Sequence, residues 1–123
     1  VCKAVLPHMI KQRWGRIINF SGIDPLLGGS VTKGMAKLGI VGFTRGLARE
    51  FAQYEITANC IAPGTIDVER DANLKPKALR PNQPIRRMGK PEEVVSTMLY
   101  IASEGAGFIT GQNYLVNGGM YFQ

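Results

Sequence analysis

Two lysines stand one helical turn apart near the start of the longest periodic segment of the sequence. Lys33 and Lys37 are four residues apart, a spacing that places both ammonium groups on one face of a helix. A lysine that is removed from water and set beside another cation gives up its proton more readily, so such a pair suits proton transfer. The alternative is that both are solvated side chains on an exposed helix face, because lysines are rarely buried without a partner.

A second candidate site follows the apolar segment 56–62, where residues 63–66 read Pro-Gly-Thr-Ile. A strand that ends in a sharp turn leaves backbone N–H and C=O groups free, and such groups can hydrogen-bond a polar ligand. The alternative is a turn that only reverses the chain.

Composition excludes several classes of site. The single histidine, His8, rules out a histidine-based triad or a multi-histidine metal centre, and the acidic residues match no metal-binding spacing, so we expect no metal. Cys2 and Cys60 match no metal or redox spacing, which predicts free, inert thiols in a reducing compartment and hence a cytoplasmic protein.

The chain of 123 residues has a net charge of +6, which favours acidic partners. No nucleic-acid-binding motif accompanies this charge, and no apolar run is long enough for a membrane span, so we expect neither nucleic acid nor membrane as a partner.

Hydrophobic periodicity predicts one domain over 1–123 in which helices and strands alternate. The longest expected helix, over 33–54, has apolar residues at steps of three and four that are expected to face the core: Ala36, Ile40, Phe43, Leu47 and Phe51. A short helix is also expected over 71–79. The remaining expected elements are helices over 1–12, 33–54 and 91–103 and strands over 16–20, 56–62 and 112–117. This order is typical of an α/β fold with a parallel sheet.

Several segments resemble the short-chain dehydrogenase/reductase family, especially its members similar to 3-oxoacyl-carrier-protein reductases: 15–22, 42–50, 59–66, 87–94, 108–112 and 116–119. The resemblance implies the C-terminal half of a doubly wound, Rossmann-like parallel sheet, with its last three strands and their covering helices. A complete member is roughly twice as long, so the N-terminal nucleotide-binding half, with its glycine-rich turn, is expected to lie outside 1–123.

The resemblance also implies roles for individual residues. The family's Tyr-x-x-x-Lys motif falls on Lys33 and Lys37 in the ungapped register, which places a lysine where the family has its tyrosine. A second register places Gly29 on the tyrosine but requires an insertion in the helix. The family's serine falls on Gly22, with Ser21 one residue away. The candidate catalytic residues are therefore Lys37, Ser21 and Lys33, and the candidate residues for NAD or NADP are Lys37, Pro63, Gly64, Thr65 and Ile66.

By resemblance, the chain is part of an NAD(P)-dependent oxidoreductase that interconverts ketones and alcohols. Because the tyrosine and the glycine-rich turn are missing, we expect this activity to be impaired or absent. The alternative is a non-catalytic assembly or binding protein. Expected partners are further copies, contacted through 117–122, or a complementing chain, and an acidic carrier protein facing the basic segment 75–90.

Overall fold

The computed structural model describes residues 1–68 and 78–123. The elements are α1 (Cys2–Gln12), β1 (Gly15–Phe20), α2 (Val31–Phe51), β2 (Ile56–Pro63), α3 (Pro91–Ala102) and β3 (Asn113–Val116), with 3-10 turns η1 (Asp24–Leu27), η2 (Ala52–Tyr54) and η3 (Glu104–Ala106). This order confirms the predicted alternation, with boundaries that differ by a few residues. The short helix expected over 71–79 lies mostly outside the described residues.

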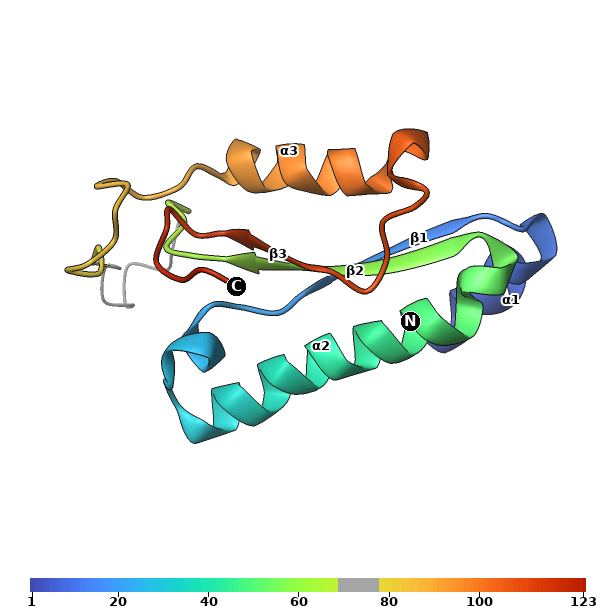
Figure 1. Ribbon diagram of the computed structural model, residues 1–123, viewed down its shortest axis with the longest axis horizontal. Helices are drawn as coiled ribbons and strands as arrows, with labels where there is room; N and C mark the ends of the chain where they lie inside the picture. The colour runs from blue at the N-terminus through green and yellow to red at the C-terminus, as the bar shows by residue number, and fades with distance from the viewer. Residues whose placement is uncertain (69–77) are drawn as a thin grey trace.

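The three strands form one parallel sheet in the order β1-β2-β3. In its register, Ile17 lies opposite Ala58 and Ile61 lies opposite Tyr114. Helices α1 and α2 lie on one side of the sheet and α3 on the other (Figure 1). Because the strands are parallel, all three end at the same edge of the molecule. The expected Rossmann-like α/β arrangement, with three parallel strands and covering helices, is therefore confirmed.

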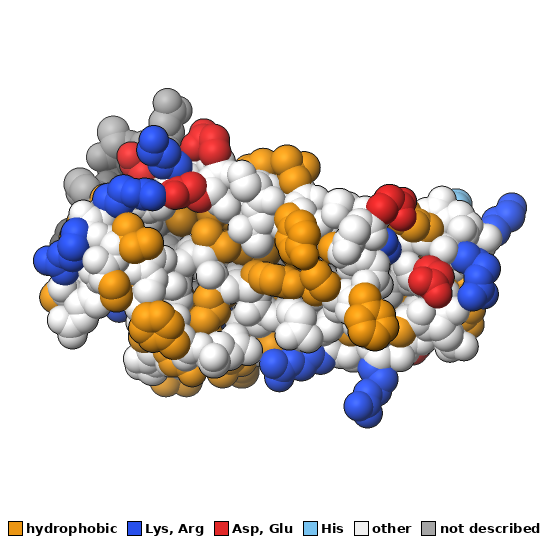
Figure 2. All heavy atoms as spheres, turned by 45° about the horizontal axis from the view of Figure 1, so that its top comes forward, with side chains coloured by type: hydrophobic (Ala, Val, Ile, Leu, Met, Phe, Trp, Pro, Cys, Tyr) orange, Lys and Arg blue, Asp and Glu red, His pale blue; other side chains and the backbone are white. Residues whose placement is uncertain are grey.

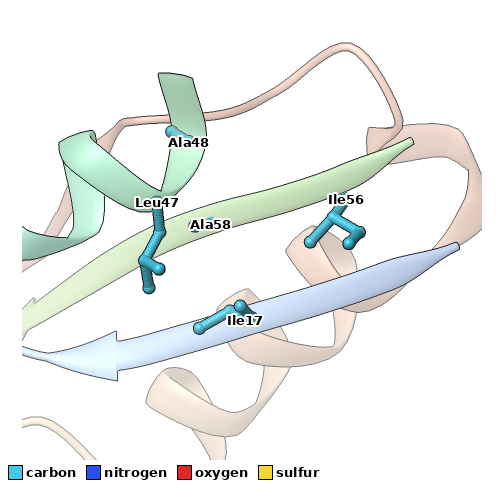
Figure 3. Close-up of a cluster of buried hydrophobic side chains, with 5 residues drawn as sticks. All are labelled: Ile17, Leu47, Ala48, Ile56 and Ala58. Atoms are coloured by element: carbon cyan, nitrogen blue, oxygen red, sulfur yellow. The ribbon is translucent and has the colours of Figure 1, made fainter. Parts of the chain in front are cut away.

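Central strand β2 is buried on both faces over residues 56–62. On one face, Ile56 and Ala58 pack with Ile17, Leu47 and Ala48 (Figure 3). On the other face, Ile61 belongs to a cluster with Ile66, Val94 and Ile101. Because side chains alternate between the two faces of a strand, the mostly apolar sequence of β2 requires a helix on each side.

The buried face of α2 differs from the expected apolar stripe. Phe43, which was expected to face the core, is 53% exposed, and Ala36 is exposed as well. Thr44 is buried instead, because its Oγ1 donates to the Ile40 carbonyl at 2.8 Å and accepts from Asn19 Nδ2 at 2.9 Å. A small polar residue whose hydrogen bonds are satisfied can thus occupy the core-facing position. An apolar pattern alone does not reveal it.

The packing of α3 yields a test of the core. Ile101 has 0% exposure in the cluster with Ile61, whereas Leu99 on the same helix is 62% exposed. Replacing Ile101 with alanine leaves a cavity, so we expect Ile101→Ala to lower the free energy of unfolding by about 2–5 kcal/mol in urea titrations. Leu99→Ala is the matched control and should change it little at protein concentrations low enough to keep the chain monomeric. Equal losses in the two variants would contradict this description of the core.

The start of α3 is held by a small network of charged groups. Glu93 accepts from the Lys90 backbone N–H at 2.7 Å, and both of its carboxylate oxygens accept from the Arg87 guanidinium, at 2.7 and 2.8 Å. The hydrogen bonds from Arg87, followed by the one from Lys90, lower the pKa of Glu93 to about 2.

The lowered pKa of Glu93 predicts a pH dependence. The stabilisation from this carboxylate is present above the unfolded-state pKa of about 4.3 and is lost as the pH falls from there towards 2. Amide protection factors in the first turn of α3, which compare the observed exchange rate with the intrinsic rate at the same pH, should therefore fall over that interval. In Glu93→Gln they should already be lower at neutral pH. Glu92→Gln removes a charge from the same turn and serves as control. An acid response in Glu93→Gln as large as in the wild type would refute the assignment.

Candidate functional site

A cleft of about 540 Å³ lies at the carboxyl ends of β1 and β2. Its walls come from the loop 22–25, the first turns of α2, the turn 63–65 and Met120, together with Ala78 and Arg80. In parallel sheets, this edge is where neighbouring loops diverge and ligands bind. The fold thus places the two lysines of α2 and the turn after β2 on the walls of one cleft.

Lys37 connects helix α2 to the end of strand β1. Its Nζ donates to the Phe20 carbonyl at 3.0 Å. An ammonium group has three donors, so two remain for other partners in the cleft. The hydrogen bond to Phe20 therefore positions the ammonium group without using up its donors.

Lys33 lies one turn earlier on α2 and its side chain is 68% exposed. Its Nζ is 4.0 Å from a carboxylate oxygen of Asp24. The Arg80 guanidinium also contacts the Asp24 carboxylate. The first turn of α2 contains no acidic residue, and Ser30 makes no capping hydrogen bond, so Asp24 supplies the negative charge near this helix start.

Ser21 is directed away from the cleft. It is 4% exposed, and its Oγ donates to the Asn113 side chain at 2.7 Å. Its backbone N–H continues the pairing of β1 by donating to the Ile61 carbonyl at 2.9 Å. The neighbouring residue, Gly22, lines the cleft but has no side chain to offer. The structure therefore does not bring Ser21 together with Lys33 and Lys37.

The turn after β2 divides between two cavities. Pro63, Gly64 and Thr65 line the cleft, whereas Ile66 is buried, pairs with Gly89 and lines a separate cavity of about 550 Å³. A Cβ on Gly64 would lie 2.8 Å from the Asn117 Cα, so only glycine permits this close approach. Packing alone thus accounts for the glycine at position 64, whatever the turn binds.

The residues of the cleft fit the nicotinamide riboside half of a dinucleotide. Such a group presents ribose hydroxyls and a carboxamide, which need hydrogen-bond donors and acceptors set close together. The Lys37 ammonium supplies donors, and the strand-end turn at 63–65 supplies backbone groups on the same cleft.

Sequence reasoning missed Asp24, Arg80 and Asn113. Asn113 meets Ser21 only through the pairing of the sheet, and Arg80 lies far from Asp24 in sequence. The basic composition of 75–90 was the one available signal for Arg80.

The two thiols differ in burial, because Cys60 is buried and Cys2 is only partly buried. Both cysteines are free, and burial raises the pKa of the Cys60 thiol against the smaller opposing effect of its hydrogen bond to Thr44.

Within residues 1–68 and 78–123, no three or more His, Cys, Asp or Glu side chains are grouped to hold a metal ion. The helices in that same part of the chain are too short or too polar to cross a membrane.

Comparison with known proteins gives concordant matches. A family model described as enoyl-(acyl carrier protein) reductase matches residues 1–121. The 3-oxoacyl-(acyl-carrier-protein) reductase of Pseudomonas aeruginosa is 44% identical over 97% of this chain and 50% of its own length. The reductase of the same name from Chlamydia trachomatis is 44% identical over 98% of this chain and 50% of its own length. Nodulation protein G of Azospirillum brasilense is 38% identical over 100% of this chain and 52% of its own length.

The chain therefore spans about half the length of the curated relatives that it matches. The family match extends over nearly all of the chain, including the strands and loops that build the cleft. From the match and the parallel sheet together, we conclude that this chain belongs to the short-chain dehydrogenase/reductase family of oxidoreductases.

Proposed function

We propose that this chain forms the substrate-side part of an NAD(P)-dependent oxidoreductase that interconverts ketones and alcohols with reduced efficiency. The observation that carries the proposal is that Lys37 and the turn 63–65 line the same cleft. In this proposal, Lys37 binds the ribose of the cofactor and the backbone of the turn binds its carboxamide. A bound nicotinamide supplies or accepts the hydride.

The proposed loss of efficiency follows from the proton-transfer groups. By family resemblance, a tyrosine would exchange the proton with the substrate oxygen, but Lys33 stands at that position. Lys33 is largely exposed, and its ammonium group lies 4.0 Å from the Asp24 carboxylate, so nothing buried holds it in place for a substrate oxygen. The Ser21 hydroxyl donates to Asn113, so in this proposal it is not available to donate to the substrate oxygen. Both features support slow turnover.

Restoring the phenol tests this account of the proton step. We expect Lys33→Tyr to accelerate reduction of the neutral ketone methyl acetoacetate by NADPH or NADH about tenfold or more, because a positioned general acid contributes roughly 10²–10⁴-fold. Cofactor oxidation, followed by ultraviolet absorbance, is the measurement. Lys33→Phe has similar bulk without the hydroxyl and should show no gain. Equal rates for the two variants would argue against a catalytic role for position 33.

The alternative is a family member that binds or assembles without catalysis. The same two departures favour it, namely Lys33 at the tyrosine position and Ser21 turned towards Asn113. This alternative predicts no turnover in Lys33→Tyr. It also predicts that Lys37→Ala leaves assembly and partner binding unchanged.

We also propose that the protein assembles with further copies of itself, the other candidate being a complementing chain. Large apolar side chains are exposed on the outer faces of two helices, including Met35 and Phe43 of α2 and Leu99 and Tyr100 of α3. Hydrophobic side chains gather on the face that includes α3 (Figure 2). Exposed apolar clusters of this kind mark interaction surfaces.

Basic residues such as Arg86 and Lys90 support the proposal of an acidic carrier protein as a further partner.

The free thiols of Cys2 and Cys60 are compatible with a cytoplasmic location.

Sedimentation tests the proposed assembly. We expect the protein to sediment as a species larger than a monomer, and Leu99→Glu to shift it towards the monomer because a charge would be buried in the contact. Lys11→Glu on α1 is a control for the change of charge. A monodisperse monomer with a cooperative thermal transition would refute the proposal.

A further inference from the structure

The cleft contains an excess of positive charge among its described residues. Lys33, Lys37 and Arg80 line it, and Asp24 is the one acidic residue on its walls. Lys37 is directed to the Phe20 carbonyl, whereas Lys33 and Arg80 converge on the carboxylate of Asp24. Positive charge in a concave site with apolar walls, such as Ile23, attracts anions more strongly than the same charge on a flat surface.

The Asp24 carboxylate shows which chemical group this pair of cations accommodates. One of its oxygens contacts the Arg80 guanidinium, and the other lies 4.0 Å from the Lys33 ammonium. The side chain of Asp24 is 39% exposed, that of Arg80 47% and that of Lys33 68%. Ion pairs with this exposure are weak and exchange readily with other ions. A carboxylate from solution can therefore replace that of Asp24 at small cost.

We propose that the cleft accepts substrates with a carboxylate near the reacting carbonyl, so that the ketone substrate is a small oxo acid. The carboxylate of the substrate binds Lys33 and Arg80 in place of Asp24. Lys37 and the turn 63–65 remain available for the cofactor. The naming of an oxo acid as substrate rests on the proposed function, but binding of the carboxylate requires no hydride transfer.

Lys33 thereby acquires a role that explains why a cation stands at this position. A phenol cannot neutralise a carboxylate, whereas an ammonium group can. The cleft, at about 540 Å³, has room for an acid of a few carbon atoms beside the nicotinamide ring.

The test compares acetoacetate with its neutral methyl ester, which carries the same ketone without the charge. Isothermal titration calorimetry with the purified protein should show tighter binding of acetoacetate, and the difference should shrink as salt is added. Lys33→Gln and Arg80→Gln should each weaken acetoacetate binding about three- to tenfold, while Asp24→Asn, which removes the competing carboxylate, should strengthen it by a similar factor. Lys11→Gln on α1 removes the same charge far from the cleft and should leave binding unchanged.

The ester also reports whether each variant retains a folded cleft, because its affinity should be the same in all of them. Equal affinity for acid and ester, or a weakening in Lys11→Gln as large as in Lys33→Gln, would overturn the inference. Tighter binding of acetoacetate without turnover would support the inference and count against the proposed function. Turnover of both compounds at equal affinity would support the proposed function and overturn the inference.

Discussion

Burial of β2 on both faces is the constraint on which the rest of this structure depends. Residues 56–62 are all buried, and several have no exposed surface at all. Such a strand is stable only with a helix on each side and a strand along each edge, which is the arrangement that α2, α3, β1 and β3 supply. The arrangement fixes where β2 ends, and with it the position of the turn 63–65 on the cleft.

Buried polar groups then set α2 against the sheet. Asn19 donates to Thr44, and the Cys60 thiol donates to the same hydroxyl at 3.1 Å, so adjacent strands are both bonded to one side chain of the helix. Because an unpaired polar group in the core is costly, these bonds specify one position of α2 along the sheet. Lys37, two turns before Thr44, is thereby brought within 3.0 Å of the Phe20 carbonyl. The same requirement for partners commits Ser21 to Asn113.

The sequence predicts the α/β order well because apolar strands and periodic helices alternate with clear turn residues between them. The family resemblance assigned Lys33, Lys37 and residues 63–66 to catalysis and cofactor binding, and the structure places Lys33, Lys37 and residues 63–65 on the walls of one cleft. The contacts of Ser21 with Asn113 and of Asp24 with Arg80 join residues 92 and 56 positions apart, and no local pattern encodes them. The apolar pattern predicted that Phe43 faces the core, but the neighbouring Thr44 is buried there and Phe43 is exposed. A pattern of apolar residues does not reveal a buried threonine whose hydrogen bonds are satisfied.

The central claim is that Lys37 and the turn 63–65 form the nicotinamide side of a cofactor site. A crystal structure of the protein with NAD or NADP bound tests it most directly. The account predicts hydrogen bonds from the Lys37 ammonium to the ribose beside the nicotinamide, and from backbone groups of 63–65 to the carboxamide. A dinucleotide bound on another surface, with neither Lys37 nor the turn in contact with it, would contradict the account.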